Sequence, residues 1–317
     1  MPHSINDSEE NLNNLCDLSQ KDKIWDQHKF ENDCITDIFY LVNHSNFKKW
    51  AERTDSCANW LDFEWSDPNL KTNEIFLKLF NASFCRVRTC PICQWRKSLK
   101  HKARLLERLP VIETEYTESR WLFLTLTVRN CEVKDLQKII KSMNYGFRKL
   151  KSQKKWKALG WIKTIEVTRG ADNSAHPHFH ILLDMPNSYF GKYYLSKMKW
   201  VEIWKKCMKL SYAPNIDIRT VKPNISKGKS SLTSVIAEIA KYTTKPKTFI
   251  DNPDWFVEYA KQIHQMRLID TGGSLRGILS NDYEDLIHID EEKDKEDNHK
   301  KSDLRFKWDK KSNHYQY

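Results

Sequence analysis

Glycine is scarce in this 317-residue chain, with 8 residues in all. So few glycines argue against a glycine-rich phosphate loop and against a fold dominated by loops. No apolar run approaches the roughly 18 residues that a membrane span needs. The opening stretch MPHSINDSEENLNN has neither a basic nor an apolar region, so we expect no secretory signal and a cytoplasmic setting. In that reducing compartment, the eight cysteines favour metal ligands or free thiols over disulfides.

Charge is unevenly distributed along the chain. Residues 57–280 hold 39 Lys and Arg against 20 Asp and Glu, a net charge of +19, whereas both flanking segments are net acidic. A basic body between acidic ends is typical of a protein that binds a polyanion. We therefore expect four segments, namely a polar acidic N-terminal extension (1–56), a basic cysteine-containing module (57–112), a main domain (113–280) and a charged, partly disordered C-terminal tail (281–317).

Hydrophobic periodicity predicts an α+β main domain with an antiparallel sheet and flanking helices, ferredoxin-like or a relative of that fold. The stretch GADNSA between two strand patterns is a hairpin signal. The mixed-charge run 290–303 is expected to be disordered, and the aromatic residues of 304–317 favour a short strand or a ligand-contacting tail. Residues 37–54 carry a weak helical pattern. Within the main domain, strands are expected at 120–130, 161–170, 176–185 and within 215–222, and helices at 135–160, 193–209 and 231–245.

Three histidines fall within five positions in the stretch HPHFHILL. Alternate side chains of a strand share a face, so His178 and His180 lie side by side while Phe179 faces a packed layer. Such a pair can chelate a divalent cation, with Glu166 on the preceding strand as an oxygen ligand. His176 is the alternative third ligand. Two imidazoles and a carboxylate leave open positions for phosphate oxygens, which suits Mg²⁺ or Mn²⁺.

The stretch EIAKYTTK follows within the last expected helix of the domain. Glu238 and Tyr242 are four residues apart and therefore neighbours on one helix face, with Lys241 beside them and Lys245 nearby. A phenol close to ammonium groups and a metal-bound phosphate can attack phosphorus. Taken alone, a tyrosine at this spacing is more often a surface residue of a helix with no catalytic role.

The motifs FLTLTVRN, HPHFHILL and EIAKYTTK, in this order and at these separations, resemble the three motifs of rolling-circle replication initiators. These are the HUH (His, hydrophobe, His) endonucleases of small bacterial plasmids. The match is to the subgroup with a single catalytic tyrosine and an acidic partner four residues before it, and it covers roughly 57–280. The resemblance implies an HUH endonuclease fold for 113–280. It also implies Tyr242 as nucleophile, His178, His180 and Glu166 as metal ligands, and Glu238 as activator of the terminating step.

Cysteines 85, 90 and 93 in the stretch FCRVRTCPICQWRKSLKHKAR have a C-x4-C-x2-C spacing. Three thiolates are one short of a tetrahedral zinc site, and Cys57 is the best fourth ligand, with His101 as the alternative. Plasmid initiators of the same subgroup show a similar cysteine pattern. Residues 85–106 also hold seven Lys and Arg, no Asp or Glu, and an interleaved tryptophan. We expect contacts with DNA phosphates and bases in this segment and in the expected helix 231–245. The residues are Arg86, Arg88, Trp95, Arg96, Lys97 and Lys241.

The resemblance implies a metal-dependent nickase and strand transferase that uses Mg²⁺ or Mn²⁺ for catalysis and Zn²⁺ for structure. Its implied partners are plasmid origin DNA, duplex and single-stranded with a hairpin, and the host helicase and DNA polymerase; no oligomeric state is implied. Two other functions stay open: a single-tyrosine HUH transposase, and a non-catalytic zinc-containing DNA-binding regulator. The cysteine module fits the transposase poorly, and the regulator has no use for the Glu238–Tyr242 pair.

Overall fold

The chain forms two compact units. Unit 1 consists of the described residues of 1–93 and 286–317, and unit 2 of those of 94–285. The four segments expected from the charge distribution are grouped differently here, because 1–56 and 286–317 belong to the same unit as the four clustered cysteines. The computed structural model describes residues 13–68, 73–115, 119–222, 231–241, 246–279, 286–287 and 304–317.

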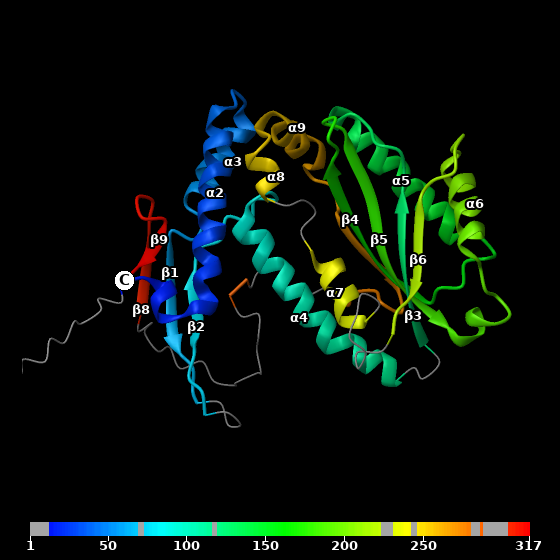
Figure 1. The fold of residues 1–317 in the computed structure, drawn as a ribbon, viewed down its shortest axis with the longest axis horizontal. Helices are drawn as coiled ribbons and strands as arrows, with labels where there is room; N and C mark the ends of the chain where they lie inside the picture. Colours follow the sequence, from blue (N-terminus) through cyan, green and yellow to red (C-terminus); the bar gives the residue numbers. More distant parts are fainter. Residues whose placement is uncertain are drawn as a thin grey trace, which may run out of the picture. The chain divides into compact units, whose positions relative to one another are not determined.

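Unit 1 combines helices with a four-stranded antiparallel sheet of order β2-β1-β8-β9 (Figure 1). Large apolar side chains spaced through a polar sequence, among them Trp25, Phe39 and Phe47, are almost fully buried. Burial of these rings explains why 13–55 folds despite its charge. The elements are α1 (Leu15–Leu18), η1 (Gln20–Lys23), α2 (Ile24–Leu41), α3 (Ser45–Asp55), β1 (Trp60–Trp65), β2 (Leu77–Ala82), β8 (Leu304–Asp309) and β9 (His314–Gln316), with α4 (Pro91–Glu115) leading on into unit 2.

Strands β8 and β9 complete the sheet of unit 1, although all of unit 2 separates them from β1 in sequence. β8 pairs antiparallel with β1, and Arg305 binds both carboxylate oxygens of Asp62 at 2.6 and 2.8 Å. On the next strand, the ring of Tyr315 is fully buried. The sequence prediction of a short strand in 304–317 is therefore confirmed.

Unit 2 is built on a five-stranded antiparallel sheet of order β6-β3-β5-β4-β7. The predicted hairpin is present, since β4 and β5 are joined by a short turn at 170–174. Besides α4, the elements are β3 (Ser119–Thr127), η2 (Val133–Asp135), α5 (Leu136–Lys151), β4 (Gly160–Arg169), β5 (Ala175–Pro186), η3 (Asn187–Phe190), α6 (Lys197–Met208), β6 (Ile216–Thr220), α7 (Leu232–Ala240), α8 (Pro246–Ile250), α9 (Pro253–Ile263) and β7 (Ile269–Gly273).

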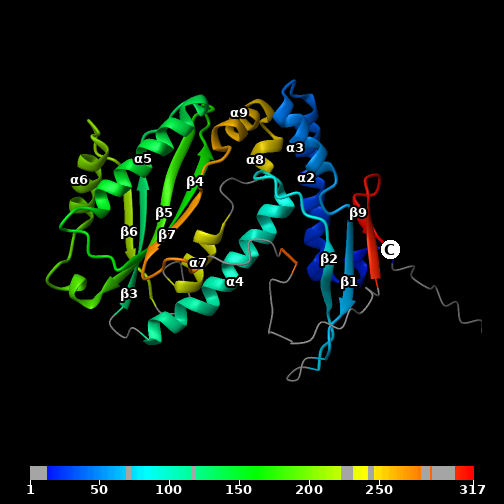
Figure 2. The same ribbon diagram turned by 180° about the vertical axis from the view of Figure 1, so that it is seen from behind.

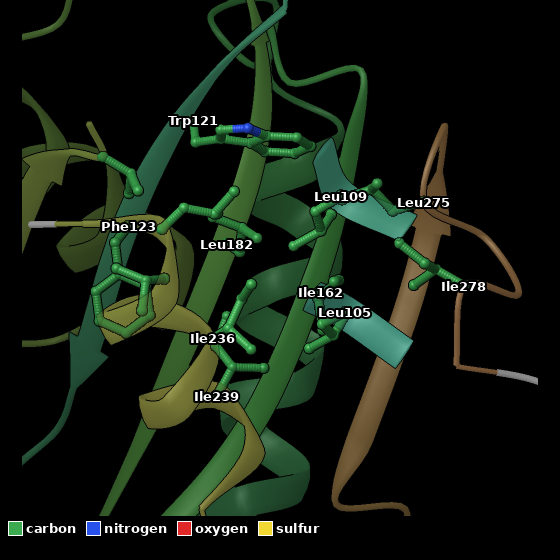
Figure 3. Close-up of a cluster of buried hydrophobic side chains, with 13 residues drawn as sticks. Leu105, Leu109, Trp121, Phe123, Ile162, Leu182, Ile236, Ile239, Leu275 and Ile278 are labelled. Atoms are coloured by element: carbon green, nitrogen blue, oxygen red, sulfur yellow. The ribbon is translucent and has the colours of Figure 1, made fainter. Parts of the chain in front are cut away.

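Helices cover both faces of this sheet, α5 and α6 on one side and α4 and α7 on the other (Figures 1 and 2). On the first side the rings of Phe179 and Phe147 meet edge-on, as expected for the face of β5 that lacks the histidines. On the second side, leucine and isoleucine side chains of α4 and α7 pack on Trp121, Phe123, Ile162 and Leu182 of three adjacent strands (Figure 3). This core fixes α7 over the face that carries the histidines.

The predicted order of strands and helices in the main domain is confirmed, and the protein is a mixed α+β chain with antiparallel sheets and flanking helices. The helix expected at 135–160 is shorter, because α5 ends at Lys151 and Gly160 already begins β4. Trp156 accounts for the early end, since it turns back to pack edge-on against Phe147 and Trp161.

The helix expected at 231–245 is also shorter, because α7 ends at Ala240 and Lys241 already has an extended backbone (φ −56°, ψ 160°). The spacing that places Glu238 and Tyr242 on one helix face therefore does not hold, since the helix ends before Tyr242. Residues 242–245 and 290–303 lie outside the described part of the chain, so the predicted disordered run is not tested. No helix in the described ranges is both long and apolar enough to cross a bilayer.

Candidate metal sites

The first candidate site lies where β4 and β5 pair. Glu166 stands opposite His178 and Thr164 opposite His180, and paired residues of antiparallel strands share a face. The hairpin register therefore brings the carboxylate and both imidazoles together, as the sequence predicted. Phe123 of β3 pairs with Leu182 of β5 and therefore lies on the same face. Its ring stacks on that of His180, with 5.6 Å between the centroids.

Three donor atoms converge at this site. The Nε2 atoms of His178 and His180 lie 2.9 and 2.7 Å from the same oxygen, Oε2 of Glu166. Nδ1 of His178 lies 3.2 Å from the carbonyl of His176, and Nδ1 of His180 lies 3.3 Å from the hydroxyl of Thr125. Each imidazole is held from behind while its Nε2 points at one spot, which is the arrangement that a two-histidine, one-carboxylate metal site requires. A divalent cation fits this donor set.

Glu166 is held in its charged form. Burial of the side chain raises its pKa, but hydrogen bonds and electrostatic attraction from His178 and His180 outweigh the burial and lower the pKa well below the usual value. The carboxylate is therefore ionised at neutral pH and available as an anionic oxygen ligand.

His176 points to a different partner. Its Nδ1 lies 2.6 Å from Oδ1 of Asn130, whose amide nitrogen in turn donates to Ser174. Among the described residues, the group of mutually close donors contains Glu166, His178 and His180 without His176. The sequence offered Glu166 and His176 as candidates for the third ligand. The structure brings Glu166, and not His176, to His178 and His180.

Glu238 extends from α7 to the rear of the same site. One carboxylate oxygen lies 3.5 Å from Nδ1 of His180, and the other accepts a hydrogen bond from Arg219 at 3.0 Å. The guanidinium of Arg219 also lies over the Phe123 ring, 4.8 Å from its centroid. Arg219 was not predicted as a site residue. The alternation of side chains in the expected strand 215–222 assigns it to one face of the sheet, but does not show which residues of the neighbouring strand it meets. Tyr242 and Lys245 lie outside the described residues, and Lys241, the last described residue before them, is exposed.

The second candidate site is the cysteine cluster of unit 1. The Sγ atom of Cys57 lies 3.7 Å from that of Cys93 and 3.6 Å from that of Cys90, and Cys85 lies 3.7 Å from Cys93. Zn–S bonds of about 2.3 Å in a tetrahedron place sulfurs about 3.8 Å apart. The cluster thus has the dimensions of a four-thiolate zinc site with Cys57 as the fourth ligand, and His101 is not part of it.

Backbone amides support these sulfurs. Cys57 accepts from the amide of Cys85 at 3.4 Å, and Cys93 accepts from that of Arg86 at 3.2 Å, an approach that uses the left-handed backbone at Arg86 (φ 56°). Hydrogen bonds from the other three cysteines lower the pKa of Cys57, whereas burial raises that of Cys90. Four thiolates in so small a volume need a cation to offset their charge.

The basic residues expected to contact DNA differ in exposure. Arg86 and Lys241 are exposed, and Arg88, Trp95 and Lys97 are half-buried. Arg96 is 8% exposed, and its guanidinium lies 5.5 Å from the centre of the Trp95 ring. In this structure Arg96 therefore packs within the protein, whereas the other five present surface to solvent.

Comparison with known proteins identifies the family of this chain. The fold and sites define a mixed α+β protein with a candidate divalent-cation centre on an antiparallel sheet and a separate four-cysteine cluster. Residues 76–316 match the family described as Replication protein, and the chain belongs to that family. It is 36% identical over 277 residues to a Protein rep of Bacillus amyloliquefaciens, covering 78% of this chain and 79% of that protein.

Two further relatives extend the comparison. A Protein rep of Lentilactobacillus hilgardii is 30% identical over 311 residues, covering 94% of this chain and 96% of the relative. One from Streptococcus pneumoniae is 31% identical over 287 residues, covering 86% of each chain. No solved structure matches the chain.

Proposed function

We propose that this protein initiates rolling-circle replication of a plasmid by nicking one DNA strand at the origin and joining itself to the cut end. The observation that carries the proposal is the convergence of His178, His180 and Glu166 on one spot, with distances of 2.7 and 2.9 Å. Membership of the Replication protein family supports the biological setting. The motif order, with EIAKYTTK after the histidines, supports the nicking chemistry.

The three donors suit Mg²⁺ or Mn²⁺, and such a cation supplies Lewis-acid polarisation of the scissile phosphate. The chain itself supplies the nucleophile. The Tyr242 phenolic oxygen loses its proton and forms a bond to phosphorus, while the bond from phosphorus to the 3′ oxygen breaks and that oxygen takes up a proton. The products are a 5′-phosphotyrosine and a free 3′-OH, which primes the host DNA polymerase as a host helicase opens the duplex. Lys241 and Lys245 flank the tyrosine in sequence and favour its phenolate form.

DNA binding is assigned to the basic body of the chain. The exposed and half-buried residues Arg86, Arg88, Trp95, Lys97 and Lys241 offer cations for phosphates and a ring for base stacking. The zinc ion proposed for the four cysteines holds the fold of unit 1 and takes no part in the chemistry.

The test of this function is a nicking assay on supercoiled plasmid that carries the cognate origin, with Mn²⁺, with Mg²⁺ and with a chelator. We expect open-circular DNA with protein attached to the 5′ end, only when a divalent cation is present. A protein that binds the origin but never nicks it, whatever the cation, is a regulator and not a nuclease.

We expect Cys90→Ser to lose the tightly bound zinc and to unfold unit 1. Structural zinc contributes about 10–16 kcal/mol of apparent binding free energy in small zinc-dependent peptides, so loss of the ion costs about as much as the whole stability of an ordinary domain. Metal content and thermal unfolding measure the effect. Cys34→Ala is the matched control, because Cys34 lies on α2 outside the cluster. Retention of stoichiometric zinc in Cys90→Ser would count against the assignment.

We expect Glu238→Ala and Glu238→Gln still to nick and to form the DNA adduct. If Glu238 activates the terminating step, release fails and displaced strands run past one plasmid length. Its 3.5 Å approach to His180 defines the competing role of orienting that imidazole. In that case Glu238→Ala lowers cation affinity by about 10–100-fold, and nicking recovers at high Mn²⁺. Adduct yield against Mn²⁺ concentration, measured with product length, separates the two roles.

A further inference from the structure

A third group of metal-binding side chains lies in unit 1, apart from the four cysteines. It consists of Cys16 on α1, Asp26 on α2 and His314 on β9. Nδ1 of His314 lies 2.9 Å from Oδ2 of Asp26 and 3.9 Å from Sγ of Cys16, and all three donor atoms lie within 4.8 Å of one another. Cys16 and Asp26 are 8% and 7% exposed, whereas the His314 side chain is 40% exposed.

The backbone around the group is already ordered by other contacts. Asn14 forms a bridge with Gln316, and the amide of Tyr317 donates to the carbonyl of Asn13 at 2.8 Å. The amide of Tyr315 donates to Oδ1 of Asp26 at 3.0 Å. This last bond fixes the carboxylate and leaves its second oxygen, Oδ2, aimed at the imidazole. Supported ligands of this kind are the mark of a prepared metal site.

The geometry excludes a nucleophilic triad of cysteine, histidine and aspartate. In such a triad the imidazole uses one ring nitrogen for the thiol and the other for the carboxylate. Here both the thiol and the carboxylate approach the same nitrogen, Nδ1 of His314. A metal ion needs the opposite arrangement, with all donors converging on one point.

We propose that Cys16, Asp26 and His314 form a second zinc site, with its fourth position open to solvent on the exposed side of His314. Bonds of about 2.0–2.3 Å to nitrogen, oxygen and sulfur place the nitrogen of a tetrahedral site about 3.3–3.6 Å from the oxygen and the sulfur. The observed distances of 2.9 and 3.9 Å lie on either side of this range, so shifts of a few tenths of an ångström bring the donors to zinc-binding positions. The mixed nitrogen, oxygen and sulfur donors suit zinc better than Mg²⁺ or Ca²⁺. In the present structure the thiol instead lies 3.7 Å from Oδ1 of Asp17, and the thiol proton leaves when zinc binds.

Such a site fastens residues 13–26 to residues 304–317. Next to His314, the Tyr315 hydroxyl donates to the carbonyl of Ala58 at 2.5 Å, one residue after the zinc-cluster member Cys57. Strand β9 therefore connects the two zinc sites through adjacent side chains. Loss of the second zinc is expected to loosen β9 and to lower the thermal stability of unit 1 without removing the four-cysteine zinc.

The experiment measures zinc per chain in the full-length protein. All proteins carry His178→Ala and His180→Ala, so that the site on the sheet of unit 2 adds no zinc. We expect two zinc ions per chain, falling to one with Cys16→Ala or with His314→Ala, and remaining at two with the matched controls Cys34→Ala and His44→Ala. A content of one zinc in the parent protein, or of two in His314→Ala, overturns the proposal.

Cobalt substitution gives a second readout, and its main measurement is made on the parent protein. A site with one thiolate and a site with four differ in the intensity of their thiolate-to-cobalt charge-transfer bands. Titration of the metal-free parent with Co²⁺ should give two phases of unequal intensity, and His314→Gln should remove the weaker one. A single phase with the intensity of four thiolates contradicts the second site.

Discussion

Tyr242→Phe should abolish both nicking and covalent attachment to DNA. The substitution removes the oxygen that bonds to phosphorus and leaves the ring in place, so binding of origin DNA should stay close to that of the parent protein. Loss of a nucleophile that acts within a catalytic unit costs at least about 10³-fold in rate. The measurement is the yield of protein–DNA adduct on a labelled origin strand, with duplex binding measured in parallel.

The matched control for this experiment is Tyr194→Phe, because Tyr194 is an exposed tyrosine, 63% accessible, in the same unit. It should nick like the parent protein. Adduct formation by Tyr242→Phe would mean that another residue attacks phosphorus, and peptide mapping of the adduct would identify it.

His178→Ala and His180→Ala should each abolish cation-dependent nicking while duplex binding stays nearly intact. Each removes one of two imidazole nitrogens that lie within 2.9 Å of the Glu166 oxygen, so affinity for Mn²⁺ should fall by more than about 100-fold. Binding persists because it is spread over many Lys and Arg contacts. Nicking rate against Mn²⁺ concentration and origin binding in a chelator are the two measurements.

His176→Ala is the control for this prediction. His176 contacts Asn130 and not Glu166, so its loss should cost much less nicking activity than the loss of His178. Equal loss of binding and cleavage in His178→Ala would instead assign the histidines to packing. A large effect of His176→Ala on Mn²⁺ affinity would make His176 a ligand.

The candidate cation site was predictable because its members are local. A hairpin with a short turn fixes the register of its strands, and strand alternation then assigns each residue to a face. Glu166, His178 and His180 could therefore be placed together from the sequence. Arg219 could not, because β6 pairs with β3 across nearly a hundred residues and nothing in its sequence sets that register.

The architecture of unit 1 could not be predicted from the sequence, for a related reason. Residues 1–56 were expected to be a polar acidic extension because the few buried rings, such as Trp25 and Phe39, are spaced among charged residues. Their partners come from elsewhere in the chain, as when Nε1 of Trp308 donates to Asp33 at 2.7 Å. The cysteine spacing did predict three members of the cluster, since C-P-x-C is a local motif, and the similar cysteine pattern of plasmid initiators supported Cys57 as the fourth member.

The pairing of β8 with β1 sets an order of events during synthesis of the protein. Strands β1 and β2 leave the ribosome early, yet their sheet stays two strands short until residues 304–317 have been made. Unit 2 is contiguous in sequence and can fold first, as domains do when they emerge. Unit 2 is thus expected to be folded before the cysteine-bearing unit is complete, and an interrupted polypeptide would carry the candidate cation site without a finished unit 1.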